Sequence, residues 1–382
     1  MPPLTHHLLT PPHLHESLPA SPPWLPAQLA SQRLSFDQAL WLLTHANIHE
    51  LGLLARQVQL AYHPLESPLT FVIDRNVNYT NICNVDCMFC AFYRHADAPD
   101  AYVLPYEVIA SKAQALLDAN GTQFLLQGGV NPNLPFDYYT DLLSRLKHDF
   151  PALTLHAFST SEISFMATLT GQSVRWVLEQ LVAAGLDSIP GAGAEILHDD
   201  VRRKISPKKV DTDDWLGVME TAHGLGLKTT ATMMIGTVEQ PHHVIDHLMR
   251  LRDLQDRTQG FTAFIPWSFQ PDNTQLAKLP TNKLATGLDF IKTVAIARLV
   301  LDNIPNIQSS WLTQGMKLCQ VALAYGANDM GGLVLEENVV TEAGIKHETH
   351  TVDEVVALAS QLGKQAAQRN TQYKVLRLLP NA

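Results

Sequence analysis

Three cysteines in one short segment are the residues of this 382-residue chain best suited to do chemistry. Cys83, Cys87 and Cys90 have the spacing C-x3-C-x2-C, and they come shortly after Thr70–Asp74, an apolar run that predicts a buried strand. Three close thiolates can hold an iron–sulfur cluster, and on a four-iron cluster they leave one iron open for another ligand. The spacing therefore favours a catalytic cluster.

Two other interpretations of the cysteines remain open at this stage. A structural zinc site usually takes four ligands in paired spacing, and an electron-transfer cluster normally takes four cysteines. In either case the fourth ligand would have to be Cys319 or a histidine. Cys319 lies in an apolar-rich segment, which is typical of a buried small side chain. The absence of a second cysteine pair in the sequence favours the open cluster.

Composition bears on the compartment and the partners. The net charge is −10, and no basic stripe with interleaved aromatic residues is present, which argues against nucleic acid as the main partner. Four cysteines do not make a disulfide framework, so clustered thiols indicate a reducing compartment and predict a cytoplasmic protein. No window approaches the roughly 20 apolar residues of a membrane span, so no membrane interaction is expected.

The chain divides into parts of different character. The first part is rich in Pro and His, lacks a secretory signal and predicts a disordered tail. A helix is then predicted to begin at Ser35, which with Gln38 forms a capping box. The predicted parts are the tail (1–33), a helical lead-in (34–66), a barrel core (67–312) and a C-terminal segment that closes the barrel (313–382).

From residue 70 onward, apolar strand patterns alternate with helical patterns. The predicted strands are Thr70–Asp74, Thr122–Gln127, Thr154–Phe158, Asp187–Ile189, Thr229–Ile235, Phe261–Pro266, Ile307–Leu312 and Gly331–Leu335. Such alternation over about 250 residues predicts an α/β fold, a (β/α) TIM-type barrel. A doubly wound open sheet is the alternative, but no Gly-rich dinucleotide fingerprint follows the first strand.

Polar and glycine-rich residues follow the predicted strands, where barrels of this type place their chemistry. The cysteines follow the first strand, and the next strand ends in Gln127-Gly128-Gly129. The later strand ends carry Ser159 and Glu162, then Glu195, Gly236 and Glu239, and Trp267 and Gln270.

The cysteine spacing, with Phe89 just before the last cysteine, resembles the signature of radical SAM enzymes. Over about residues 34 to 375 the chain is similar to the radical SAM enzymes of the futalosine menaquinone pathway and to their deazaflavin-forming relatives. The motifs that carry this resemblance are Asn78–Cys83, Cys90–Arg94, Leu125–Gly129, Ala194–Leu197, Ile205–Lys209, Phe264–Thr274, Leu301–Gln308 and Gly326–Asp329.

The resemblance implies a radical SAM cyclase. The three cysteines would hold a 4Fe–4S cluster whose open iron binds S-adenosyl-L-methionine (SAM), and SAM cleavage would give a 5′-deoxyadenosyl radical. That radical would take hydrogen from the ribose of dehypoxanthine futalosine, and the ribose radical would add to the benzoate ring on the way to menaquinone. A low-potential electron donor such as flavodoxin or ferredoxin is also implied. The alternatives are aminofutalosine-forming or deazaflavin (FO)-forming chemistry, or a non-enzymatic iron–sulfur redox or binding module.

The resemblance also implies residues that bind the cofactor. Phe89 would pack near the adenine, or else in the core. Gln127, Gly128 and Gly129 would meet the methionine amino group, because glycines let backbone approach a ligand closely.

The same resemblance implies roles for four further polar residues. Ser159 and Glu162 would bond SAM or substrate hydroxyls, or else cap a helix. Glu195 and Arg202 would hold the ribose and carboxylate of SAM, or else form an ordinary ion pair.

The substrate side of the site is less defined by sequence. The substrate carboxylate requires a guanidinium group, for which Arg75 and Arg94 are the candidates. A base must accept the ring proton, and Tyr79, His156 and Glu195 are the candidate catalytic residues.

Overall fold

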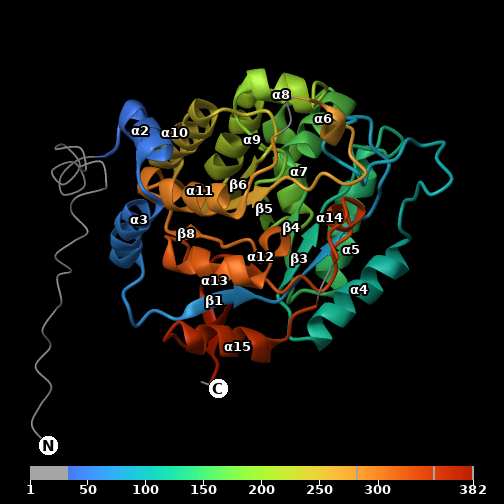
Figure 1. Ribbon diagram of the computed structural model, residues 1–382. Helices are drawn as coiled ribbons and strands as arrows, with labels where there is room; N and C mark the ends of the chain where they lie inside the picture. Colours follow the sequence, from blue (N-terminus) through green and yellow to red (C-terminus); the bar gives the residue numbers. More distant parts are fainter. Residues whose placement is uncertain (1–32, 281–282, 347–348, 381–382) are drawn as a thin grey trace, which may run out of the picture.

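The computed structural model describes residues 33–280, 283–346 and 349–380 (Figure 1). Strands form the interior of the molecule, and helices surround them (Figure 1). The predicted disordered tail, residues 1–33, lies outside the described residues except for its last residue, Arg33.

Seven parallel strands form a curled sheet in the order β2-β3-β4-β5-β6-β7-β8, which is also their order along the chain. The strands are β2 (Asp74–Val77), β3 (Gln123–Leu126), β4 (Thr154–Ala157), β5 (Ser188–Ile189), β6 (Lys228–Ile235), β7 (Phe261–Ser268) and β8 (Asn306–Ile307). Sequential parallel strands with helical crossovers produce the right-handed winding of an α/β barrel. The predicted fold class is confirmed.

The C-terminal part of the chain closes this sheet. The additional strands are β1 (Leu69–Val72), β9 (Asp329–Gly332), β10 (Ala366–Arg369) and β11 (Val375–Leu378). β1 runs through Ile73 into β2 and pairs in parallel with both β9 and β10, while β11 is antiparallel to β10. A parallel bridge between Gln308 and Asp329 joins the end of β8 to β9. The barrel thus closes where β9 and β10 pair with β1, the strand that leads into β2.

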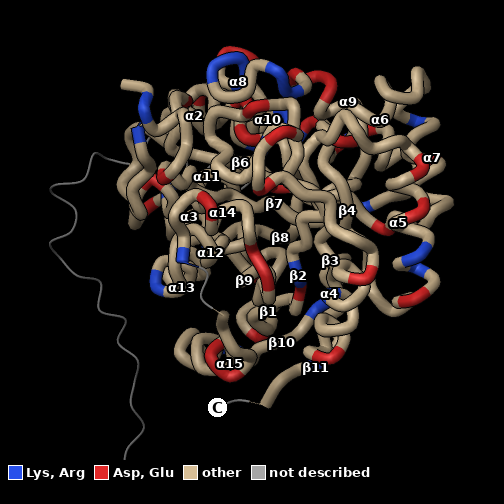
Figure 2. Tube along the Cα trace, turned by 90° about the vertical axis from the view of Figure 1, so that its right-hand side faces the viewer, with Lys and Arg blue, Asp and Glu red and all other residues tan. Residues whose placement is uncertain are grey.

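Helices connect the strands and cover them on the outside. They are α2 (Phe36–His45), α3 (Ile48–Tyr62), α4 (Tyr106–Asp118), α5 (Phe136–Asp149), α6 (Thr160–Thr170), α7 (Val174–Ala183), α8 (Asp199–Ile205), α9 (Thr212–Gly224), α10 (Pro241–Thr258), the 3-10 turn η1 (Leu276–Lys278), α11 (Gly287–Val300), α12 (Trp311–Gln314), α13 (Met316–Ala324), α14 (Val339–Glu342) and α15 (Val352–Gln361). Charged residues of both signs lie along α5 and α8 (Figure 2).

The lead-in helices form a second outer layer. α2 packs against α10, and α3 packs against α11. α11 is therefore buried over most of its length, which explains why its sequence is apolar on nearly every side. The predicted capping box is confirmed: Ser35 Oγ accepts the Gln38 N–H at 3.3 Å, and Gln38 Oε1 accepts the Ser35 N–H at 2.9 Å.

Most predicted elements are found, with one clear error. The predicted strand Thr122–Gln127 is found as β3 (Gln123–Leu126), and Thr154–Phe158 is found as β4 (Thr154–Ala157). The predicted strand Ile307–Leu312 is wrong, because β8 ends at Ile307 and a short helix, α12, begins at Trp311. The reason is local: Ser310 has a φ of 49°, a left-handed conformation that ends the strand.

No helix within the described ranges is long and apolar enough to cross a membrane.

Candidate active site

The cysteine loop (Cys83–Cys90) lies after β2, at the C-terminal end of the first barrel strands. Distant segments hold its backbone. The Met88 N–H donates to the Ile205 carbonyl at 2.9 Å, and the Met88 carbonyl accepts the Leu276 N–H at 2.7 Å. Hydrogen bonds to segments that follow β5 and β7 therefore fix the path of the loop between the second and third cysteines.

The three thiols of the loop are reduced and shielded from water. Cys87 is 8% exposed, and Cys83 and Cys90 are half-buried. Burial raises the pKa of Cys83 and Cys90, and it raises the pKa of Cys87 to about 12. The free thiols are therefore neutral near pH 7, and a metal must displace their protons in order to bind.

Donors around the sulfurs oppose this burial effect. Backbone N–H groups of Val85 and Val130 bond to Cys83 and lower its pKa, and the Lys209 ammonium lowers that of Cys87. N–H donors and a nearby cation stabilise thiolates and the anionic sulfurs of an iron–sulfur cluster. The surroundings of the cysteine loop thus fit such a cluster.

The candidate ligands of a single metal ion must lie close together. Tetrahedral zinc with sulfur ligands at about 2.3 Å would bring those sulfurs within roughly 4 Å of one another. Over the part of the chain that the structure describes, the one group of three or more candidate ligands whose atoms all lie within 4.8 Å of one another is His198, Asp200 and His243. At least two of the three cysteine sulfurs therefore lie more than 4.8 Å apart.

The histidine group is not arranged as a metal site. The Nδ1 atoms of His198 and His243 accept backbone N–H groups at 3.3 and 3.0 Å. A neutral ring whose Nδ1 is an acceptor carries its proton on Nε2, whereas a metal-bound imidazole donates from its other nitrogen.

Gly128 and Gly129 bring the end of β3 against the cysteine loop. A Cβ on Gly129 would lie 2.2 Å from the Ile82 carbonyl oxygen, and one on Gly128 would lie 2.5 Å from the Tyr79 ring. The Gly129 N–H donates to the Thr80 carbonyl at 2.9 Å. Close packing against the loop therefore requires both glycines, and their predicted contact with SAM stays a prediction.

Glu162 is a buried hydrogen-bond centre behind the cysteine loop. Its Oε1 accepts the Tyr79 hydroxyl at 2.6 Å and the Gly128 N–H at 3.1 Å. Its Oε2 accepts the Ser159 N–H at 2.6 Å, and Ser159 Oγ caps α6 in return. Burial raises the pKa of Glu162, and these hydrogen bonds oppose the rise. Ser159 and Glu162 thus form the capping box of α6, and their predicted contact with SAM or substrate stays a prediction.

A cavity of about 380 Å³ runs through the barrel interior. Phe89 and Glu195 line it on the side of the cysteine loop, and Arg369 and Tyr373 line it on the side of the C-terminal strands. Gln127 and His156, both predicted site residues, also line it. The predicted residues Tyr79, Ser159 and Glu162 do not line it, because they point into the core behind the loop.

Glu195 forms a buried ion pair next to the cysteines. Lys209 Nζ donates to Glu195 Oε1 at 2.6 Å, and the same ammonium lies 5.1 Å from the centre of the Phe89 ring. Glu195 has a φ of 42°, and its Oε2 is buried without a hydrogen-bond partner. A strained backbone and an unpartnered carboxylate oxygen at a cavity are features of ligand-binding positions.

His156 presents one nitrogen to the cavity. The Ser188 hydroxyl donates to the Lys228 carbonyl at 2.8 Å, so its oxygen accepts from His156 Nδ1 at 2.8 Å. The hydrogen-bond network thereby assigns the Nε2 atom as the acceptor. Burial, and secondarily the charge of Arg369, lowers the pKa of His156 to about 3. The ring is therefore neutral.

Three predicted arginines do not reach the cavity. Arg202, predicted to bind the cofactor, donates instead to backbone carbonyls, including that of Ala194 at 2.6 Å. Arg75 and Arg94, the candidates for the substrate carboxylate, are paired elsewhere. Arg75 bonds Glu336 at 2.7 Å, and Arg94 bonds Asp100 at 2.6 Å and three backbone carbonyls.

Sequence reasoning missed three charged residues of this region: Lys209, Asp74 and Arg369. Lys209 belongs to Ile205–Lys209, one of the motifs that carry the family resemblance. Its ion-pair partner, Glu195, lies 14 residues earlier, and no spacing in the sequence predicts this ion pair. Asp74 was included in the first predicted strand as one of its residues. Arg369 carries no sequence signal, because it reaches the cavity only through the pairing of β10 with β1.

A closed parallel barrel with three cysteines beside an interior cavity defines a cluster-bearing barrel enzyme. A family model described as "Radical SAM superfamily" matches residues 77–251, and one described as "CofH/MqnC C-terminal region" matches residues 258–381. The chain belongs to the radical SAM superfamily and, within it, to the family of the cyclic dehypoxanthine futalosine synthases.

Two relatives and one solved structure illustrate this membership. The cyclic dehypoxanthine futalosine synthase of Halalkalibacterium halodurans is 46% identical, over 91% of this chain and 92% of that protein. The enzyme of the same name from Streptomyces coelicolor is 40% identical, over 93% and 88%. The crystal structure of methylornithine synthase (PylB) is 16% identical with a TM-score of 0.70, covering 90% of this chain and 96% of that one, and shows the shared fold.

Proposed function

We propose that this enzyme cyclises dehypoxanthine futalosine in menaquinone biosynthesis. The reaction takes hydrogen from the ribose and joins the resulting ribose carbon to the benzoate ring, giving cyclic dehypoxanthine futalosine. The observation that carries the proposal is the interior cavity beside the cysteine loop, which is lined by Phe89 of that loop and by Glu195. The names of the relatives that match nearly the whole chain support the same substrate.

The radical SAM family implies a 4Fe–4S cluster and SAM. Cys83, Cys87 and Cys90 would hold the cluster, since they are three free thiols on one loop with the spacing C-x3-C-x2-C. Gln127, Phe89 and Glu195 line the cavity nearby and would contact SAM. When bound, the cluster and SAM supply a 5′-deoxyadenosyl radical that abstracts a hydrogen atom.

The chain's own residues shield and orient the reacting groups. The cavity wall carries large apolar side chains such as Leu125, Ile265 and Trp267, which exclude water from a reactive carbon radical. His156 Nε2 faces the same space as a neutral acceptor and would orient a substrate hydroxyl. These contacts hold the ribose and the aromatic ring in the geometry that ring closure requires.

Two of the three candidate bases remain suitable for the proton that the aromatic ring loses. Glu195 Oε2 and His156 Nε2 each offer a lone pair in the cavity. Tyr79 is not proposed, because its hydroxyl already donates to Glu162 and does not reach the cavity. Glu195→Gln and His156→Gln would separate the two. The variant that lacks the base should still form 5′-deoxyadenosine but release less cyclised product.

We propose a low-potential one-electron carrier such as flavodoxin or ferredoxin as the electron donor, and the cytoplasm as the compartment. A reducing compartment keeps free thiols available for the cluster, in agreement with four unpaired cysteines.

The decisive experiment uses anaerobically reconstituted protein, SAM, a reductant and dehypoxanthine futalosine. The expected result is 5′-deoxyadenosine together with a product that is lighter than the substrate by two hydrogen atoms. SAM cleavage without that product would instead indicate the aminofutalosine-forming or FO-forming chemistry of related enzymes. No 5′-deoxyadenosine from an iron-loaded protein would indicate a redox or binding module. One zinc and no iron would indicate a structural metal site.

A further inference from the structure

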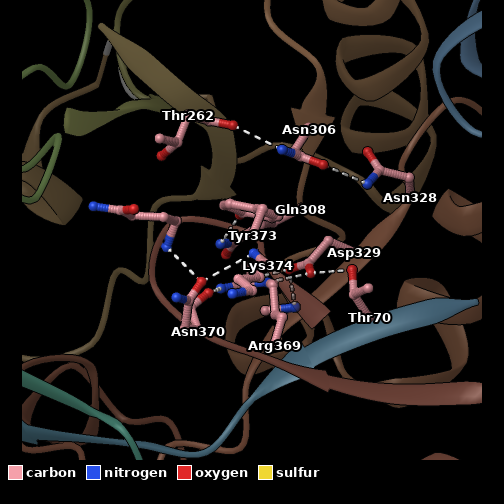
Figure 3. Close-up of polar contacts among 12 residues, drawn as sticks. Thr70, Thr262, Asn306, Gln308, Asn328, Asp329, Arg369, Asn370, Tyr373 and Lys374 are labelled. Carbon is pink, nitrogen blue, oxygen red and sulfur yellow. Dashed lines mark hydrogen bonds and ion pairs between the residues drawn. The ribbon is translucent and has the colours of Figure 1, made fainter. Parts of the chain in front are cut away.

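The floor of the cavity is built by the C-terminal turn that joins β10 to β11. Arg369 ends β10, and Thr371 and Tyr373 follow it in the turn. All three line the cavity, on the side opposite the cysteine loop. Figure 3 shows that this turn meets the strand ends that carry Gln308 and Asp329. A segment about 300 residues after the first strand thus contributes to the binding space.

Arg369 supplies the positive charge of this floor. Among the described residues, it is the one lysine or arginine that lines the cavity. The other charged residues of the lining are acidic: Asp74, Glu195 and Glu337. Because Arg75 and Arg94 are paired elsewhere, an anionic ligand in this cavity has a single guanidinium to approach.

Asp329, which is not part of the cavity lining, orients that guanidinium. Arg369 Nε and Nη2 donate to the two oxygens of Asp329 at 2.6 and 2.8 Å (Figure 3). Asp329 is fully buried and also accepts the Thr70 hydroxyl at 2.6 Å and the Gly331 N–H at 2.8 Å. Arg369 Nη1 also donates to the Asn370 carbonyl at 3.0 Å, so the guanidinium is held rigidly beside the cavity, with one hydrogen on Nη1 and one on Nη2 left for a further acceptor.

Two hydroxyl groups of the same turn lack an acceptor. Thr371 is 4% exposed, and its Oγ1 has no hydrogen-bond partner. The Tyr373 oxygen accepts the Gln308 amide at 2.8 Å, which leaves its own hydrogen to donate. Tyr373 also has a φ of 63°, and the centre of its ring lies 3.8 Å from Arg369 Cζ, the central carbon of the guanidinium. A buried, unpartnered hydroxyl and a strained aromatic residue beside a cation indicate a ligand subsite.

Two of the three acidic residues of the lining, Glu337 and Asp74, already accept hydrogen bonds, and the third, Glu195, lies on the side of the cysteine loop. Glu337 accepts backbone N–H groups and the Asn76 amide at 2.6 Å. Asp74 accepts the Val334 N–H at 2.9 Å and the Gln123 amide at 3.4 Å. Neither residue competes for the two hydroxyl groups of the C-terminal turn.

We propose that Arg369, Thr371 and Tyr373 form the subsite that binds the aromatic carboxylate of the substrate. The inference rests on the proposed function for the identity of the ligand. A carboxylate there accepts the outward N–H of the guanidinium and the two hydroxyl hydrogens, which are charge-assisted hydrogen bonds. Anchored at the floor, the benzoate group points its other end, with the ribose, toward the cysteine loop. Thr371 and Tyr373 are thus specificity-determining residues.

The test measures binding separately from turnover. Equilibrium dialysis of reconstituted enzyme with SAM and no reductant gives the Kd of dehypoxanthine futalosine and of its methyl ester. Thr371→Val and Tyr373→Phe should each weaken binding of the acid by roughly 10- to 100-fold, the loss of one hydrogen bond to a charged group. They should leave the ester nearly unaffected.

Thr122→Val is the matched control. Thr122 also has a buried hydroxyl without a partner, but it lies outside the cavity, so the acid should bind this variant as it binds the wild type. Melting curves establish that each variant is folded. Wild-type Kd values for the acid in both cavity variants, or equal losses for acid and ester, would overturn the inference. Tight, carboxylate-dependent binding without cyclised product would leave the subsite intact and refute the proposed function, and no binding of the acid to the wild type would refute both.

Discussion

Replacing Asp74 by Asn should make the protein more stable, by an amount that depends on pH. Asp74 is 6% exposed at the cavity wall, and its carboxylate packs against Gly332. Burial raises its pKa from 3.8 to about 6, although the Val334 N–H and the Arg369 charge oppose the rise. At neutral pH the folded protein thus carries a charge that burial disfavours.

Proton linkage gives the sign and the size of this change in the free energy of unfolding. Between pH 4 and 6 the folded state binds more protons at Asp74 than the unfolded state, so stability falls as the pH rises through that range. A shift of about two pKa units corresponds to about 3 kcal/mol at pH 7, which is lost in full above pH 6 and regained below pH 4. An Asn at position 74 has the same shape and does not ionise, so this dependence should disappear.

Urea unfolding of the apoprotein, followed by circular dichroism from pH 4 to 7.5, measures the effect. Asp74→Asn and the wild type should have similar stability near pH 4, and the variant should be more stable by up to about 3 kcal/mol near pH 7. Asp141→Asn, at an exposed position of α5, is the control and should show no such trend. A difference that is constant with pH, or that grows toward acid, would refute the reasoning.

Three further outcomes are expected. Gly129→Ala should lower the iron content after reconstitution while helicity is retained, because the new Cβ would lie 2.2 Å from the carbonyl that precedes Cys83; full iron loading would contradict this. Cys319→Ala should keep its iron and Cys83→Ala should not, as iron and sulfide analysis would show; equal loading would make Cys319 a ligand. Asp329→Asn should destabilise the protein by about 3–5 kcal/mol in urea unfolding, because it leaves Arg369 buried without its carboxylate; a loss under about 1 kcal/mol would disprove that pairing's importance.

The cysteine site could be predicted because its information is local. Cys83, Cys87 and Cys90 lie within eight residues, so their spacing alone limits where their sulfurs can be. The alternation of strands and helices is equally local, and it gave the barrel together with the rule that chemistry lies at the strand ends. The glycines of the second strand end were recognised for the same reason, although the structure shows them packing directly against the cysteine loop.

The partners of charged residues could not be predicted, because several were equally compatible with the sequence. Glu162 could bind a ligand or cap α6, and only the folded structure shows it bonded to Tyr79 and Ser159. Arg75 had the side chain for a carboxylate, but Glu336, 261 residues later, occupies it.

The sequence by itself determined a parallel α/β barrel, a three-cysteine loop after its first strand, and the radical SAM family whose motifs it shares. Tertiary structure alone decided which polar groups face the cavity. Barrel closure brings β9 and β10 beside β1, and this pairing places Arg369 and Tyr373 at the cavity, with Asp329 paired to Arg369 outside the lining. The physical reason is that spacing along the chain constrains residues a few positions apart, whereas residues 300 positions apart meet only where the sheet closes.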